Sequence, residues 1–237
     1  MARRPGADEI ARIEPLARVF RAVATIVIVI VAGTLILDAL GISVAPVLAT
    51  AGVAGVAIGF GAQSLIKDYF AGFFLLLEDQ VRQDDVIEVA GKAGVVEEVT
   101  LRYVRLRDFE GHVHFVPNGE IKVLTNRTRG YAFATMDIGV AYATDIEQAL
   151  SLLREVGAAL RADPAWRGRL AADLEVQGVE KLADSAVVLR SRFKVVPAIE
   201  QWNVRREFLR RFKKACDERG IELPYPQLTI HSVAPKS

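Results

Sequence analysis

Residues 45–66 read APVLATAGVAGVAIGFGAQSLI, and this uncharged stretch, which ends at Lys67 and Asp68, decides the fold class. It is longer than the about 20 residues that an α-helix needs to cross the hydrocarbon core of a bilayer. Pro46 falls where the first turn would be, a position at which proline is tolerated. The stretch therefore predicts a transmembrane helix over residues 44–66.

Side chains of different size separate onto different faces of this helix. At about 100° per residue, one face carries Ala49, Val53, Val56, Phe60 and Gln63. Two mainly small ridges flank that face, one with Gly52, Gly55 and Gly59 and the other with Ala54, Ala57 and Gly61. Small residues let helix backbones approach closely. The pattern predicts a ring of identical helices, and ordinary packing of small residues inside one polypeptide is the alternative.

The face between the two ridges would line the axis of such a ring, with Ala49, Val53 and Gln63 as lining residues. Val56 and Phe60 lie one turn apart and would form two stacked apolar rings. Hydrophobic constrictions of this kind gate channels by dewetting. We therefore predict Val56 and Phe60 to be the seal.

A second apolar segment precedes this helix. Residues 22–37 carry no charge, and residues 16–40 form a stretch long enough to span a bilayer if Arg18 and Arg21 extend toward the headgroups. A cleaved signal peptide is disfavoured because no small-residue cleavage site leads into polar sequence. Arginines precede this span, and Lys67 and Arg82 follow the next one. The positive-inside rule then predicts that segment 1–15 and both termini are cytoplasmic.

The rest of the chain predicts interfacial and soluble parts. Residues 67–78 are expected to form an amphipathic interfacial helix, and residues 79–131 a small β-barrel with strands near 86–89, 94–99, 101–107 and 112–116. Residues 132–237 show a βαββαβ order typical of a ferredoxin-like domain. Its predicted helices cover 146–160, with Asp145 as N-cap, and 199–219, with Gly220 beyond the end, and its last strand covers 227–231.

Composition narrows the chemistry that the chain can perform. Thirty Lys and Arg against 29 Asp and Glu exclude a strongly basic nucleic-acid-binding protein, and one cysteine excludes a cysteine-based zinc cluster. Gly59-Phe60-Gly61 begins a GxGxxG-like run, but the third glycine is absent. His112 and His114 could share a metal ion, although solvated histidines are the favoured interpretation. We predict no enzyme activity, no cofactor and no metal site.

Several separate motifs resemble one family. They are GVAGVAIGFGAQSLIKDYFAG at residues 52–72, the turn VPNG at 116–119, GVAY at 139–142 and LPYPQ at 223–227. In register from residue 44 to residue 231, the chain resembles the small-conductance mechanosensitive channel family. The resemblance implies a membrane α-helical homoheptamer with a Sm-like β domain and an αβ domain forming a cytoplasmic vestibule, in the inner membrane of a bacterium or an equivalent organelle membrane.

The resemblance also assigns roles to residues. The seal positions of the family fall on Val56 and Phe60, where its prototype has leucine at both, and the packing positions fall on Ala54, Ala57, Gly55 and Gly59. The usual hinge glycine after the matched Gln63 is Ser64 here, so the expected hinges are Ser64 and Gly72. The prototype has three spans, whereas two are predicted here.

The sequence therefore predicts a tension-opened channel that passes ions and small solutes with weak selectivity and protects against osmotic downshock. Its expected partners are membrane lipid, the permeating ions and small solutes, and six further copies of the chain, without nucleic acid. The alternative is a membrane-anchored scaffold that binds RNA or protein through its cytoplasmic domains. That alternative would use the basic side chains Arg205, Arg206, Arg210, Arg211, Lys213 and Lys214, which more often form a solvated helix face.

Overall fold

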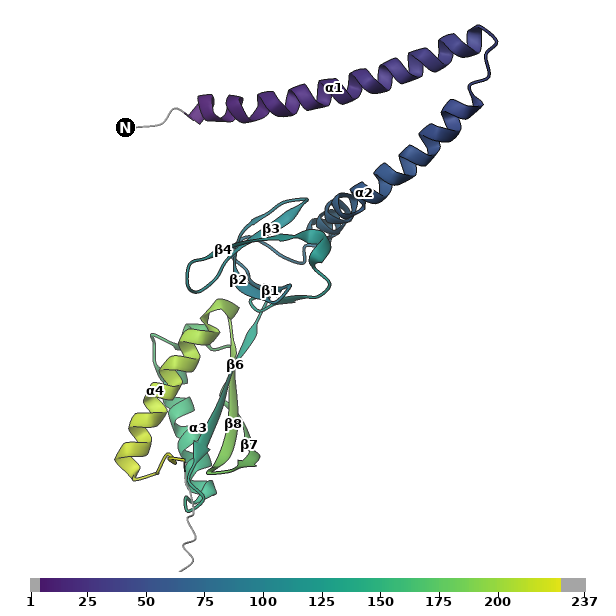
Figure 1. Ribbon diagram of the computed structural model, residues 1–237. Helices are drawn as coiled ribbons and strands as arrows, with labels where there is room; N and C mark the ends of the chain where they lie inside the picture. The colour runs from purple at the N-terminus through teal and green to yellow at the C-terminus, as the bar shows by residue number, and fades with distance from the viewer. Residues whose placement is uncertain (1–4, 227–237) are drawn as a thin grey trace, which may run out of the picture. The chain divides into compact units, whose positions relative to one another are not determined.

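A computed structural model describes residues 5–226 and, within the first helix, the side chains of Pro15 and of residues from 17 onward. The chain divides into two units, residues 1–64 and 65–237. The first unit holds helix α1, Pro5–Ala39, and the first part of helix α2, Ala45–Leu77 (Figure 1). Both helices are long and apolar enough to cross a membrane, over Ala17–Ala39 and Ala45–Leu77.

Helix α2 is longer than the predicted span. Residues 67–77, where the sequence predicted an amphipathic interfacial helix over 67–78, continue it without a break. The polar pair Lys67 and Asp68 does not interrupt the backbone, because lysine is compatible with a helix and no proline follows within the segment. Side chains beyond residue 64 belong to the second unit, where Gly72 and Leu75 are buried.

The β domain is an antiparallel sheet in the order β4-β3-β2-β1-β5. Its strands are β1 Val86–Val89, β2 Lys92–Val99, β3 Tyr103–Arg107, β4 Val113–Pro117 and β5 Leu124–Asn126. Alternate residues such as Ile87, Val89, Val104 and Leu106 are buried and form its core. The four strands that the sequence predicted are present, and β5 was not predicted.

The predicted barrel is not closed: β4 and β5 are the two edges of the described sheet. The turn after β4 carries the chain from one edge to the other. Residues Asn118–Glu120 form a short 3-10 helix that leaves β4 and leads to the far edge, beside β1. Asn118 donates its backbone N–H to the carbonyl of Arg102 at 2.9 Å, and this bond fixes the turn at the base of β3.

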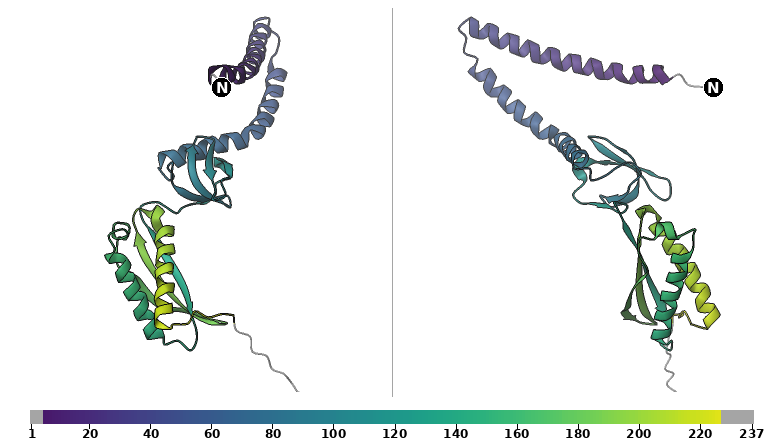
Figure 2. Two further views of the ribbon diagram at one scale, coloured as in Figure 1. Left: turned by 90° about the vertical axis from the view of Figure 1, so that its left-hand side faces the viewer. Right: turned by 180° about the vertical axis from the view of Figure 1, so that it is seen from behind.

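The α+β domain has the described order β6-α3-β7-β8-α4. Its elements are β6 Ala132–Val140, α3 Ile146–Ala162, β7 Glu175–Ala183, β8 Ala186–Val195 and α4 Gln201–Arg219. The sheet order is β6-β8-β7, and both helices cover one face of it (Figure 2). This arrangement agrees with the first five elements of the predicted ferredoxin-like domain. The predicted strand at 227–231 lies outside the described residues.

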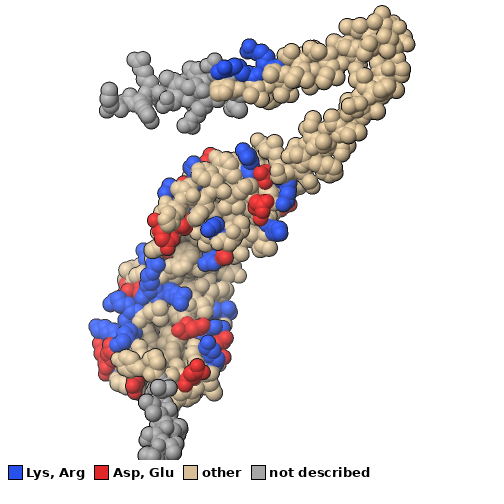
Figure 3. Space-filling model, viewed as in Figure 1, with Lys and Arg blue, Asp and Glu red and all other residues tan. Residues whose placement is uncertain are grey.

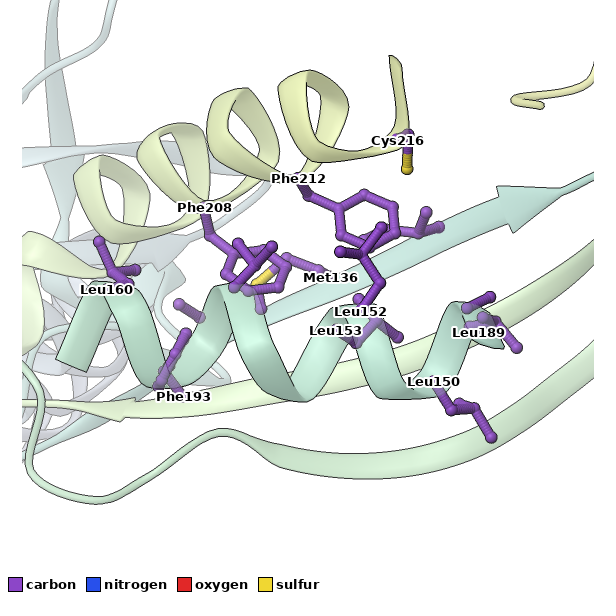
Figure 4. Close-up of a cluster of buried hydrophobic side chains, with 14 of the residues drawn as sticks. Met136, Leu150, Leu152, Leu153, Leu160, Leu189, Phe193, Phe208, Phe212 and Cys216 are labelled. Carbon is purple, nitrogen blue, oxygen red and sulfur yellow. The ribbon is translucent and has the colours of Figure 1, made fainter. Parts of the chain in front are cut away.

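The core of this domain forms where the sequence periodicity placed it. Ala149, Leu152, Leu153 and Val156 of α3 are buried in this core. Figure 4 shows Leu152 and Leu153 between α3 and Phe212 of α4. From α4, Phe208 and Phe212 stack with ring centroids 6.1 Å apart, and Cys216 is fully buried.

The helix ends of this domain also match their predicted caps. Asp145 accepts hydrogen bonds from the backbone N–H groups of Glu147 and Gln148 at 2.8 and 3.3 Å. Gly220 caps α4 in the left-handed conformation at φ 68°, which glycine adopts without a Cβ penalty.

Candidate functional site

The predicted seal and lining residues all lie on α2 in its first, unpartnered part. Val53, Val56 and Phe60 are exposed by 74%, 60% and 73% in a single chain. Ala49 and Gln63 are also exposed. Leaving such side chains in water is unfavourable, by about 25 cal/mol for each Å² of apolar surface. This face therefore needs either lipid or further protein around it.

The glycines of the two ridges are open as well. A Cβ added at Gly52, Gly55, Gly59 or Gly61 would meet no other atom of the described chain within 4 Å, leaving aside the helix's own backbone. Ala54 and Ala57 are exposed on the same helix. No contact among the described residues thus requires these positions to be small.

Charge is distributed as a membrane-spanning unit would require. In Figure 3, the surface of the two apolar helices lacks Lys, Arg, Asp and Glu over most of its length, with basic side chains near the start of α1. The acidic and basic side chains gather instead over the second unit. Apolar surface without charge is what a lipid environment accepts.

The lower part of α2 packs on the β domain through one helix face. Asp68, Gly72 and Leu75 follow one another at the i, i+4, i+7 spacing, and Gly72 and Leu75 are buried. The carboxylate Oδ1 of Asp68 accepts a hydrogen bond from the backbone N–H of Gly119 at 2.9 Å. The sequence did not predict this contact of Asp68, because Gly119 lies 51 residues away and no local sequence pattern indicates the pair.

Gly72 is the tightest point of this junction. A Cβ on Gly72 would lie 2.0 Å from the carbonyl oxygen of Leu101 and 2.3 Å from Nδ2 of Asn118. Asn118 is fully buried, and its Nδ2 donates to the carbonyl of Thr100 at 2.9 Å. The absence of a side chain at Gly72 thus allows close packing. Ser64, the other expected hinge, is exposed on the same uninterrupted helix.

The basic side chains of α4 are largely paired with acids of their own domain. Glu207 accepts hydrogen bonds from Arg210 at 2.7 and 2.8 Å and from Arg211 at 2.8 Å. These bonds, that from Arg210 first, lower the pKa of Glu207 to about 2. Lys213 pairs with Asp217, and Lys214 lies 3.7 Å from Glu218. Four of the six basic side chains that the scaffold alternative would use thus have an acidic partner. Such pairing reduces the free cations on which phosphate binding depends.

Comparison with known proteins assigns the domains to one group. Residues 23–63 match the transmembrane helices 2/3 of mechanosensitive ion channels, residues 64–129 match the beta-domain of these channels, and residues 134–223 match the C-terminal domain of the mechanosensitive ion channel MscS. None of these is an enzyme domain.

Individual relatives agree with this assignment. The chain is 35% identical over 204 residues to a small-conductance mechanosensitive channel of Caldanaerobacter subterraneus, covering 86% of this chain and 71% of that protein. It is 30% identical to the moderate conductance mechanosensitive channel YbiO of Escherichia coli, covering 90% of this chain but only 29% of that longer protein.

A solved structure has the same fold. The crystal structure of Helicobacter pylori MscS in its closed state superposes with a TM-score of 0.79 at 22% identity, over 94% of this chain and 87% of that one. With the two apolar helices, the open β sheet and the α+β domain in the same order, the chain belongs to the small-conductance mechanosensitive channel (MscS) family.

Proposed function

We propose that this chain forms a tension-gated channel that passes ions and small solutes with weak selectivity and relieves osmotic downshock. The observation that carries the proposal is the first part of α2. It combines an apolar face with two small-residue ridges that have no partner among the described residues. A helix that only anchors a protein needs no more than one such ridge.

The proposed assembly is a homoheptamer, with the Val56 and Phe60 faces of its α2 helices around a common axis. In the closed state these two apolar rings exclude water. Stretch favours the state of larger area in the membrane plane, and α1 transmits the tension to the back of α2. Opening separates the α2 helices along their small ridges, with Ser64 and Gly72 as the proposed points of bending.

The soluble part offers edges that suit such a ring. Strands β4 and β5 are both sheet edges, and exposed edges pair readily with another chain. The proposed location is the bacterial inner membrane with both termini cytoplasmic, since basic residues flank the two spans on the same side. The proposed domain limits are 1–15, 16–40, 44–66, 67–78, 79–131 and 132–237.

Single-channel recording tests this function directly. Purified full-length protein would be reconstituted into liposomes, and excised patches would be held under stepped suction. Discrete openings whose frequency rises with suction are expected. Silence up to the tension that ruptures the patch, from protein shown to be an intact oligomer, would contradict the proposal.

A cellular assay addresses osmotic protection separately. Expression in a bacterial strain that lacks its own tension-gated channels should raise survival after a sudden fall in osmolarity. The scaffold alternative predicts no such protection and RNA that copurifies in a salt-sensitive way. The paired charges of α4 argue against that alternative.

A further inference from the structure

The hairpin that joins β3 to β4 gathers four side chains of the types that bind transition metals. Asp108, Glu110 and His112 each place one ligand atom within 4.8 Å of the others. His114, in β4, brings its Nε2 to 2.9 Å from Oδ2 of Asp108, and Nδ1 of His112 lies 3.2 Å from the same oxygen. From the sequence, only His112 and His114 were considered as metal ligands. The structure shows the carboxylates of Asp108 and Glu110 in the same hairpin.

These spacings suit a single ion. Zinc binds imidazole nitrogen and carboxylate oxygen at about 2.0–2.2 Å, so neighbouring ligand atoms of a tetrahedral site lie roughly 3.4 Å apart. The two histidine nitrogens already approach one carboxylate oxygen at 2.9 and 3.2 Å. At both contacts a bound ion would replace the bridging proton, and the ligand atoms would separate to the longer spacing of a metal site.

The backbone of the hairpin holds its ligands in place without an ion. Gly111 has φ 91°, a conformation that favours glycine, and its N–H donates to the carbonyl of Asp108 at 3.1 Å. The N–H of His112 donates to Oδ1 of Asp108 at 2.8 Å. Arg107 donates from Nη1 to the carbonyl of Gly111 at 2.7 Å. The loop is therefore preorganised, which reduces the entropic cost of binding.

The local charge is favourable for a cation. Asp108 and Glu110 supply two carboxylates to this hairpin. Arg107, whose Nη1 contacts the hairpin, pairs through Nε with the carboxylate of Glu97. Two carboxylates and two imidazoles match the donor set that zinc and its neighbours in the first transition row accept.

We propose that Asp108, Glu110, His112 and His114 form a binding site for a divalent transition-metal ion, with zinc as the best-matched ion. The side chain of His112 is 72% exposed, whereas those of His114 and Asp108 are 23% and 16% exposed. An ion can thus enter from solvent and settle against the half-buried pair. Once bound, it would join the end of β3 to β4 and stiffen this edge of the β domain.

Metal titration of the full-length protein in detergent tests the site. The protein would be purified without a histidine tag, stripped with a chelator and titrated with Zn²⁺ against a zinc indicator. One ion per chain is expected, and excess Mg²⁺ should not compete, since it prefers oxygen ligands. Co²⁺ in place of Zn²⁺ should give the visible absorption of a nitrogen- and oxygen-coordinated ion.

Two variants locate the ion. His112→Ala removes an exposed side chain and leaves the fold intact, and Asp108→Asn keeps the shape of the central ligand. Each should weaken zinc binding by at least about tenfold, the lower end of the loss caused even by supporting residues around metal sites. His231→Ala, which removes the third histidine of the chain, is the matched control and should bind as the wild type does.

Three results of these titrations would contradict the metal site. A wild-type protein that binds no zinc at micromolar concentrations would overturn the proposal. So would a His112→Ala variant with unchanged affinity and stoichiometry, or loss of the ion in His231→Ala alone. The titration does not depend on channel activity, so the metal site and the proposed channel function are tested independently.

Discussion

Phe60 is the bulkiest side chain on the apolar face of α2, and it is 73% exposed in the single chain. Replacing Phe60 with serine puts a hydroxyl where the proposed seal must stay dry, so the closed pore should hydrate and leak. We expect Phe60→Ser to slow the growth of expressing cells and to open spontaneously in patches. Ile58→Ser, on the opposite side of the helix, is the control. Normal growth and quiet patches for Phe60→Ser would show that the seal lies elsewhere.

Gly72 offers a second test at a single position. Gly72→Ala puts a methyl group 2.0 Å from the carbonyl oxygen of Leu101, so α2 or the β domain must shift. Overpacking of this kind costs about 1–3 kcal/mol, which a lower unfolding temperature of the detergent-solubilised protein would report. Gly33→Ala in α1 meets open space and should be neutral or slightly stabilising. Equal unfolding temperatures for the two variants would contradict the tight junction.

The two small-residue ridges of α2 are proposed to pack the whole helix against its neighbours. Gly55→Leu adds a large side chain to one ridge, and neighbouring helices could no longer approach there. We expect the proposed heptamer to be lost or depleted in native mass spectrometry. Ala51→Leu, on the back of the same helix, adds the same bulk and should leave the oligomer intact. A normal heptamer with normal gating in Gly55→Leu would rule out the ring arrangement.

Helix α4 gives a pH prediction through Glu207. Its pKa falls from an ordinary value of 4.5 to about 2, because Arg210 and Arg211 donate hydrogen bonds to the charged form. The unfolded chain binds a proton at a higher pH than the folded chain does. The stability from this carboxylate is therefore complete above about pH 4.5 and is lost as the pH falls toward 2. The unfolding temperature of Glu207→Gln should therefore fall less steeply than that of the wild type as the pH is lowered from about 4.5 toward 2. An equally steep fall in both proteins would exclude this contribution of Glu207.

At the scale of the whole molecule, sequence reasoning succeeded where one local pattern sets the structure. The uncharged run at residues 45–66 predicts α2 by composition alone, and the spacing of Leu152, Leu153 and Val156 predicts the buried face of α3. Strand β5 was missed because Leu124–Asn126 has only three residues and too little alternation to detect. An amphipathic helix was predicted at residues 67–78, and α2 continues through this segment to Leu77.

The remaining misses share a physical cause. The Asp68–Gly119 hydrogen bond and the packing of Leu101 on Gly72 join segments far apart in sequence, and no periodicity encodes such pairs. The hairpin at Asp108 is intermediate: aspartate, glutamate and two histidines alternate from residue 108 to residue 114, so the signal was present in the sequence. This pattern points to a metal site only in the folded chain, where the turn at Gly111 brings the side chains together.

Cys216 is the single cysteine of the chain, and it lies fully buried in the core of the α+β domain. Burial raises the pKa of its thiol to about 11, so it stays protonated and unreactive at neutral pH. Thiol reagents should therefore not label the folded wild-type protein. A cysteine introduced at Val53 or Ser64 would be the one reactive site per chain, and spin or fluorescent probes there could follow α2 through an opening event without any prior removal of native cysteines.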